Sequence, residues 1–275
     1  MKRLALGIMV SCLLVGLAAA LPAIASGQSL MMATTTSTDN TGLLDELAPM
    51  FKKDTGVTLK WTAVGTGKAL EMGRNCDVDV LLVHAPPAER AFVSNGYGVD
   101  RTEVMYNDFV IIGPKGDPAG ISGMSVLKAL ESLRNKEALF ISRGDDSGTN
   151  KKELGLWKEA GGTPPDKASW YLETGQGMLA TIRIAAERSG YTLTDRGTYI
   201  KYSANAGSTP MDIVVQGDKA LFNQYSVIAV DPESCPDAQY KLAKRFIQWM
   251  TAGDTQQAIG DFRLLGKTLF TPNAE

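Results

Sequence analysis

The nine residues SRGDDSGTN, at positions 142–150, combine side chains that together could hold an anion. Arg143 carries a fixed positive charge on a planar set of N–H donors. Ser147 and Thr149 can each donate one O–H, and the two glycines let a ligand come close to the backbone. A helical pattern begins directly afterwards, and the first turn of a helix offers free N–H groups and a partial positive charge. The stretch therefore predicts an anion-binding turn at the start of a helix.

Two earlier stretches share this arrangement. TTTSTDNTG, at 34–42, opens on a run of threonine and serine, and AVGTGKAL, at 63–70, places Thr66 between two glycines. Each follows a predicted strand and precedes a predicted helix. Helix capping explains a single hydroxyl at such a position, but it needs only one per helix. The hydroxyl run, and the arginine two residues before Asp145, go beyond capping, so the three strand ends together predict one anion site.

Other kinds of site fit the sequence less well. GTGKAL resembles the end of a nucleotide-binding loop, but Ala69 follows the lysine, and Thr62 stands where that motif has its first glycine. His84 is the only histidine and lacks the companions of a metal site, so we expect it to be a structural or surface residue. An exported hydrolase with Ser147 as nucleophile stays open as an alternative. Its histidine base would have to be His84, and the sequence contains no G-x-S-x-G motif.

The first part of the chain alternates between strand and helix patterns. Apolar residues of 40–56 recur on one helical face, whereas 57–64 alternates as a strand does. A strand followed by a helix, three times over, predicts a doubly wound parallel sheet, in which ligands bind beyond the carboxyl ends of the strands. The predicted strands are 30–36, 57–64 and 77–86, and the predicted helices are 40–56, 65–75 and 86–96.

A second α/β series begins after a strand and a Gly/Pro turn at 106–116. We therefore expect an α/β protein with two doubly wound lobes joined by a hinge, with a ligand cleft between them. Lobe I would comprise 26–110 and 224–275, and lobe II, inserted into it, would comprise 111–223. The predicted elements are helices at 125–136, 148–161, 176–190, 238–253 and 254–262, a strand at 138–144, and two strands around a Gly-Asp turn in 211–232.

The composition is that of a globular protein, with 44% hydrophobic and 21% charged residues in a chain of 275. A formal net charge of −2 provides no overall basic field, so we expect no nucleic-acid partner. Lys2 and Arg3, an apolar stretch over 4–21 and the small residues of AIA predict a signal peptide over 1–25. Cleavage near Ala25 would place the mature protein in the periplasm.

Two cysteines remain after the predicted cleavage. Cys76 and Cys235 could form a disulfide in an oxidising compartment, or they could stay as two unpaired, buried residues. The sequence leaves both arrangements open because it does not show whether the two residues lie close together.

Taken in order, several segments resemble the tungstate-binding proteins among the substrate-binding proteins of bacterial ABC uptake systems. The likeness covers nearly the whole mature chain. It implies a two-lobed fold like that of type II periplasmic binding proteins, and a receptor that delivers tungstate, with molybdate as a second ligand, to a membrane permease and its ATPase. It implies neither enzymatic activity nor a cofactor, and no metal site, since tungsten would enter only as its oxyanion. The segments are ATTTSTDNTGLLDELAPMFKKDTG, VGTGKALEMGRNCDVDVLLVHAP, YNDFVIIGP, SRGDDSGTN, ETGQGM and LFNQYSVIAVDP.

The same resemblance implies which residues meet the anion. Asp145 would orient the guanidinium of Arg143, and the backbone near Gly177 would add N–H donors. R-x-D-x-S-G-T also occurs in phosphate-binding proteins of this class, so a phosphate receptor is the alternative. Hydrogen phosphate carries a proton and would need an acceptor such as Asp145 or Asp146. The implied ligand residues are Thr34, Thr36, Ser37, Thr66, Arg143, Ser147 and Thr149.

Overall fold

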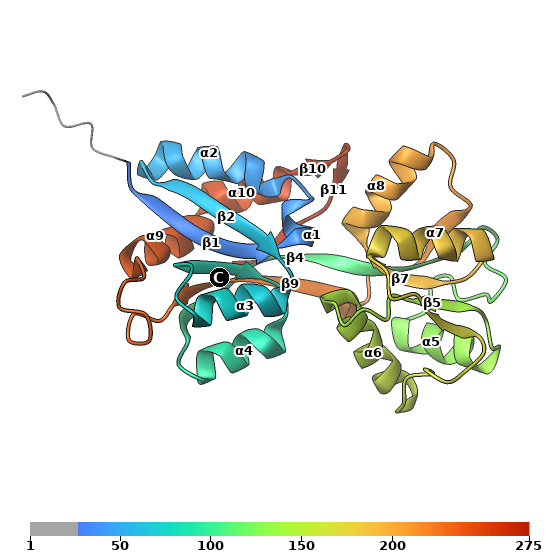
Figure 1. The fold of residues 1–275 in the computed structure, drawn as a ribbon. Coiled ribbons are helices and arrows are strands. Elements are labelled where there is room, and N and C mark those ends of the chain that lie inside the picture. The colour runs from blue at the N-terminus through green and yellow to red at the C-terminus, as the bar shows by residue number, and fades with distance from the viewer. Residues whose placement is uncertain (1–26, 275) are drawn as a thin grey trace, which may run out of the picture.

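A computed structural model describes residues 27–274, in which two α/β lobes are joined by a pair of long strands (Figure 1). These are β4 (Gly98–Pro114) and β9 (Phe222–Val230), which pair with each other in antiparallel register. The predicted signal peptide, 1–25, lies outside the described residues. The predicted lobe boundaries, at 110/111 and 223/224, fall within β4 and β9; they stay a prediction.

The sheet of the first lobe is mixed rather than wholly parallel. β1 (Ser29–Thr35) lies between β2 (Thr58–Val64) and β3 (Val80–Val83) and runs parallel to both, as the sequence predicted. β9 joins β3 in the antiparallel sense because it returns from the second lobe, and β4 then pairs with β9. The order of the sheet is β12-β4-β9-β3-β1-β2, with β12 (Thr271–Pro272) at one edge.

Helices cover both faces of this sheet. Apolar residues on one face of α2 (Leu43–Thr55) pack into the larger core cluster, and the helix ends at Gly56, whose φ of 74° suits glycine. The same cluster contains apolar side chains of α9 (Tyr240–Met250) and α10 (Gly253–Asp261), and a smaller cluster lies under α3 (Thr66–Arg74) and α4 (Pro86–Ser94). The other elements of this lobe are α1 (Thr36–Asp39), β10 (Arg263–Leu264) and β11 (Lys267–Thr268).

The second lobe is built around the far half of β4. That half pairs in antiparallel register with β7 (Thr192–Asp195) and β8 (Met211–Val215), while β5 (Phe140–Ser142) and β6 (Tyr171–Glu173) form a separate parallel pair. The surrounding helices are α5 (Val126–Asn135), α6 (Gly148–Gly161), α7 (Met178–Arg188), α8 (Arg196–Ala206) and the short η1 (Lys219–Leu221).

Several elements of the second half were not predicted. β4 begins at Gly98, well before the predicted strand, because its first half is stabilised by pairing with β9 rather than by a local pattern. β6 and β7 are too short to show a period. α8 has no amphipathic pattern, and its buried side chains pack on both lobes' cores.

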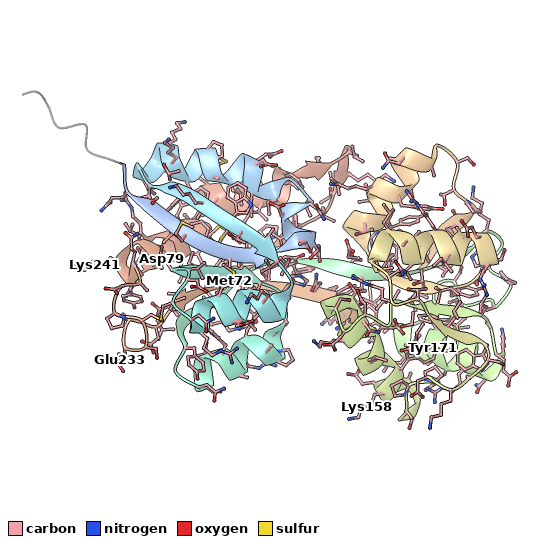
Figure 2. All side chains as sticks on the ribbon, in the orientation of Figure 1. Met72, Asp79, Lys158, Tyr171, Glu233 and Lys241 are labelled. Carbon is pink, nitrogen blue, oxygen red and sulfur yellow. A yellow bond between two sulfur atoms is a disulfide. The ribbon has the colours of Figure 1, made fainter. Side chains whose placement is uncertain are left out.

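Two long-range links stabilise the first lobe. Cys76 and Cys235, which the sequence left open, form a disulfide that joins the end of α3 to the loop after β9. The buried carboxylate of Asp79, labelled in Figure 2, accepts the N–H of Met31 at 2.8 Å and that of Gln239 at 2.9 Å. It thereby holds β1, the start of β3 and the approach to α9 together.

Candidate anion-binding site

The parallel register of the first lobe brings three polar strand ends to one edge of the sheet. Thr34 of β1 lies beside Ala63 of β2 and Leu82 of β3. Two residues farther along each chain are Thr36, Gly65 and His84. Because the carboxyl ends of neighbouring parallel strands share an edge, the hydroxyl run, the start of α3 and the only histidine lie together.

The hydroxyl run divides into buried and accessible members. The Thr34 hydroxyl is fully buried and donates to the carbonyl oxygen of Leu82 at 2.8 Å. Thr35 is 3% exposed, and its oxygen accepts the N–H of Thr38, which caps α1. Thr36 is exposed and Ser37 half-buried, so these two predicted ligands are the accessible hydroxyls among the five at 34–38.

His84, which follows β3, contacts two residues of this run. Its Nε2 atom is 3.1 Å from both the Thr35 Oγ1 and the Ser37 Oγ, and its Nδ1 atom is 2.9 Å from the Oδ1 of Asn223. The ring stacks on Tyr225 with centroids 4.7 Å apart. Burial lowers the pKa of His84, opposed by the Asn223 hydrogen bond and the charge of Asp195, so the imidazole is neutral at pH 7.

The sequence analysis treated His84 as a structural or surface residue and did not assign it to the anion site. The signal that could have connected it is its position, because His84 follows the third strand of the same parallel series as the hydroxyl run. Thr35 was missed for a different reason. The run contains adjacent threonines, and only the three-dimensional structure shows which hydroxyl faces inward.

In the second lobe, the guanidinium of Arg143 is held by Asp145. The Nε and Nη2 atoms of Arg143 donate to one carboxylate oxygen at 3.1 and 2.5 Å, and the other oxygen accepts the N–H of Ser147 at 3.2 Å. Burial raises the pKa of Asp145, but the hydrogen bonds from Ser147 and Arg143 outweigh it and lower the pKa overall. The arginine side chain is 17% exposed, and its Nη1 donors make no hydrogen bond within residues 27–274.

The turn that carries Arg143 requires a glycine. Gly144 has a φ of 58°, and a Cβ there would lie 2.7 Å from the Cβ of Glu173. Thr174, which follows Glu173, donates towards the carbonyl oxygens of Ser142 and Arg143, each at 3.2 Å. The carboxyl ends of β5 and β6 are thereby tied together, and α6 and α7 both start beside them.

The helix starts show that capping and anion binding are compatible. Ser147 caps α6 by accepting the N–H of Asn150 at 3.3 Å, which uses a lone pair and not its hydroxyl hydrogen; that hydrogen can be donated to the Asp145 carboxylate or to a ligand. Thr149, in the first turn, is 9% exposed. The starts of α3 and α7, at Gly65 and Gly177, have no side-chain cap, so their first N–H groups remain available to a ligand.

The start of α6, in the second lobe, lies beside His84 of the first lobe. A Cβ on Gly148, at the start of α6, would lie 3.9 Å from the Cε1 of His84. The first turn of α6 therefore lies against the edge that carries Ser37. Direct contact of each predicted residue with a ligand stays a prediction.

Two surface hollows lie away from these residues. One, of about 200 Å³, lies where β4 crosses between the lobes, beside Arg196 and Phe222; the other, of about 520 Å³, lies beside Pro114 and Asp212. Within residues 27–274, no group of acidic, histidine or cysteine side chains is arranged to hold a metal ion. None of the helices in that range has the length and apolarity needed to cross a membrane.

Comparison with known proteins places the chain in a family. Residues 22–254 match the model of a PBP superfamily domain. The tungstate-binding protein TupA of Campylobacter jejuni is 53% identical over 240 residues, which cover 87% of this chain and 89% of that relative. TupA of Peptoclostridium acidaminophilum is 46% identical over 251 residues, covering 90% of this chain and 86% of that relative.

Solved structures agree with this placement. The tungstate-binding protein TupA from Desulfovibrio alaskensis G20 has a TM-score of 0.88 at 63% identity, over 90% of this chain and 100% of that one. A chain described as the tungstate ABC transporter from Geobacter sulfurreducens has a TM-score of 0.74 at 50% identity, over 85% and 98%. Likeness of this extent, in sequence and in fold, shows that the chain belongs to the PBP superfamily and, within it, to the TupA family.

Proposed function

We propose that this protein binds tungstate, with molybdate as a second ligand, between the hydroxyl run of the first lobe and the start of α6 in the second. Both anions are fully ionised near neutral pH and offer only hydrogen-bond acceptors. The site would surround them with hydroxyl hydrogens, helix N–H groups and the free face of Arg143. The proposed ligand residues are Thr34, Thr36, Ser37, Thr66, Arg143, Ser147 and Thr149, with Asp145 orienting the arginine.

Thr34 is the least accessible member of this set. Its hydroxyl hydrogen is directed to Leu82, so in the described structure it could meet a ligand only by giving up that bond. Thr66 opens α3 and is half-buried, in a position where its hydroxyl and the uncapped N–H groups of α3 could serve the same anion.

The observation that carries the proposal is that the nearby carboxylates of Asp145 and Asp146 are already engaged in hydrogen bonds or ion pairs. Hydrogen phosphate needs an acceptor for its proton, and Asp145 and Asp146 were the candidates. Both oxygens of Asp145 already accept hydrogen bonds, from Arg143 and Ser147. The Asp146 side chain is 86% exposed and pairs with Lys151. The nearby carboxylates are thus already engaged while donors of the turn remain, which favours an unprotonated dianion over phosphate.

Transport is the role that best suits such a site. Relatives are described as tungstate-binding proteins, as a tungstate ABC transporter and as a putative ABC transporter anion-binding protein. In our proposal the protein is exported through the predicted signal peptide, binds its anion in the periplasm and delivers it to a permease and its ATPase. This role requires no cofactor, and the metal arrives only as oxyanion cargo.

The hydrolase alternative has little support from the geometry. Ser147 accepts a backbone N–H as a helix cap, and the Nε2 of His84 is taken up by Thr35 and Ser37. Relatives of 46–53% identity are binding proteins, in agreement with a protein that is not an enzyme.

Calorimetric titration of the mature protein with tungstate, molybdate, phosphate and sulfate would test the proposal directly. We expect tungstate to bind most tightly and molybdate to compete with it, while phosphate and sulfate do not. Tight binding of phosphate with no heat from tungstate would show that the acceptor argument is wrong and would favour the phosphate receptor.

A further inference from the structure

One face of the helix α8 is anchored in the second lobe. The helix follows β7 directly, and the side chain of Asp195 caps it by accepting the N–H of Thr198 at 2.8 Å. Tyr199 and Tyr202 are buried in a core cluster of that lobe, and the Tyr199 hydroxyl donates to the carbonyl oxygen of Met211, on β8, at 2.8 Å. α8 is therefore part of the rigid body of the second lobe.

Another face of α8 contacts the first lobe. Gly197, Ile200 and Lys201 share this face, because they are three and four residues apart. Ile200 is 5% exposed and belongs to the larger core cluster of the first lobe. A Cβ on Gly197 would lie 3.5 Å from a side-chain carbon of Leu269 and 3.7 Å from one of Leu264, and both leucines belong to the same cluster. An apolar contact between the lobes thus lies on this helix.

Lys201 adds a polar contact beside this apolar one. Its Nζ atom donates to the carbonyl oxygen of Asn40. Asn40 is the C-cap residue of α1, the short helix that contains Thr36 and Ser37. A side chain of the second lobe therefore binds the segment that carries the accessible hydroxyls of the first.

The lobes thus touch outside the connecting strands β4 and β9. The start of α6 lies beside His84, and α8 lies against Asn40 and the segment 264–269. A rotation that parts the lobes about β4 and β9 would carry α8 with the second lobe and change these contacts. Contacts made in only one of two arrangements favour that arrangement. An anion held by both lobes binds where they are together, so its apparent affinity scales with the fraction of molecules in that arrangement.

We propose that the face of α8 formed by Gly197, Ile200 and Lys201 stabilises the closed arrangement of the lobes, in which the start of α6 lies beside His84, and thereby raises the affinity for the oxyanion without contacting it. The inference rests on the proposed function and deepens it. Because no ligand atom takes part, the contact contributes the same factor for every oxyanion that the closed lobes hold. The ratio of tungstate affinity to molybdate affinity is therefore independent of it.

Ile200→Val and Ile247→Val form a matched pair of variants. Both side chains belong to the larger core cluster of the first lobe and are 5% and 7% exposed, but Ile247 lies on α9 of that lobe, whereas Ile200 comes from the second. We expect both variants to unfold more easily. Only Ile200→Val should weaken binding of tungstate and molybdate in calorimetry, by about threefold and equally for both anions. Equal affinities in the two variants would overturn the proposal.

Lys201→Met tests the polar contact, because methionine keeps most of the apolar stem and loses the charged donor. We expect binding of both anions to weaken by about threefold, and Lys201→Arg to stay close to the parent. Lys241→Met controls for the loss of one positive charge, since Lys241 is an exposed residue of α9, labelled in Figure 2. A loss as large in Lys241→Met, or a changed ratio of tungstate to molybdate affinity in Lys201→Met, would contradict the proposal.

Small-angle X-ray scattering adds a test that needs no ligand. The ligand-free double variant Ile200→Val/Lys201→Met should have a larger radius of gyration than the ligand-free parent, because fewer of its molecules have joined lobes. If the parent binds none of the anions tungstate, molybdate, phosphate and sulfate, the proposed function has failed. Equal radii of gyration would then overturn the inference about α8 as well, whereas a larger radius in the double variant would support it independently of the ligand.

Discussion

Arg143 is the residue on which the proposed site depends most. Two of its nitrogens are engaged by Asp145, which fixes the plane of the guanidinium and leaves the Nη1 donors without a partner in the described structure. Hydrogen bonds from an arginine to a dianion, partly shielded from water, contribute about 1.5–3 kcal/mol each. Lysine would keep the charge, but it cannot bind Asp145 and the ligand in this planar arrangement.

We therefore expect Arg143→Lys to weaken tungstate binding by about tenfold or more, since about 1.4 kcal/mol corresponds to one decade of affinity. Arg143→Glu should abolish measurable binding, because a carboxylate would face the dianion. Calorimetry measures the affinities, and circular dichroism checks that both variants fold. Arg263→Lys is the matched control, because Arg263 is exposed and donates only to carbonyl oxygens of its own turn. A folded Arg143→Glu protein that binds like the parent would show that Arg143 is not a ligand.

At the scale of elements, a buried glutamate joins the helix of the site to the strands behind it. Glu153 of α6 accepts the hydroxyl of Ser142, at the end of β5, at 2.8 Å and that of Tyr171, on β6, at 2.6 Å. Tyr171 is labelled in the second lobe in Figure 2. Burial raises the pKa of Glu153 to about 7, although both hydrogen bonds oppose this shift. The start of α6 is thus held beside Arg143 by a carboxyl group whose pKa is raised to about 7.

This pKa predicts how stability changes with pH. Because the folded state holds the proton more tightly than the unfolded state, whose pKa is near 4.5, the stabilisation is complete below pH 4.5 and is lost as the pH rises to about 7. The loss should be on the order of 3 kcal/mol. We expect the difference in unfolding free energy between the parent and Glu153→Gln to change by this amount over that range, in denaturant titrations at several pH values. A constant difference from pH 4 to pH 8 would mean that Glu153 ionises normally.

At the scale of the whole molecule, the disulfide closes most of the chain into a loop. Cys76 and Cys235 are 159 residues apart, so the bridge encloses the entire second lobe. Restricting so long a loop in the unfolded state is worth roughly 3–5 kcal/mol. We expect the mature protein, unfolded without reductant, to show no free thiol, and Cys76→Ser to lower the melting temperature. Two titratable thiols per chain would contradict the bridge.

Ligand binding should also be visible in the stability of the whole molecule. An anion held between the lobes binds the folded protein alone, so tungstate at 100 times its dissociation constant should add about 2.7 kcal/mol. For a chain of this size, the melting temperature should rise by roughly 5–10 °C. Calorimetric scans with tungstate, molybdate and phosphate measure this directly. A rise with phosphate alone would again favour the phosphate receptor.

Local patterns were sufficient for many elements and for the chemical character of the site. The apolar face and final glycine of α2 predicted that helix, and the strand-helix alternation predicted the parallel arrangement of β1, β2 and β3. These features depend on neighbours a few residues apart, which the sequence displays. The donors gathered at the strand ends likewise followed from residue type, because a hydroxyl or a guanidinium carries its chemistry wherever it lies.

Tertiary structure alone decided how these parts are connected. Nothing local predicted that β4 and β9 would run antiparallel across both lobes, or that Cys76 would pair with a residue 159 positions away. Along the hydroxyl run, only the fold shows that Thr34 faces the main chain of β3 while Ser37 faces His84. The histidine in turn depends on Asn223, 139 residues away. A sequence specifies which atoms can donate or accept, but the direction of each hydrogen bond depends on partners that only folding brings within 3 Å.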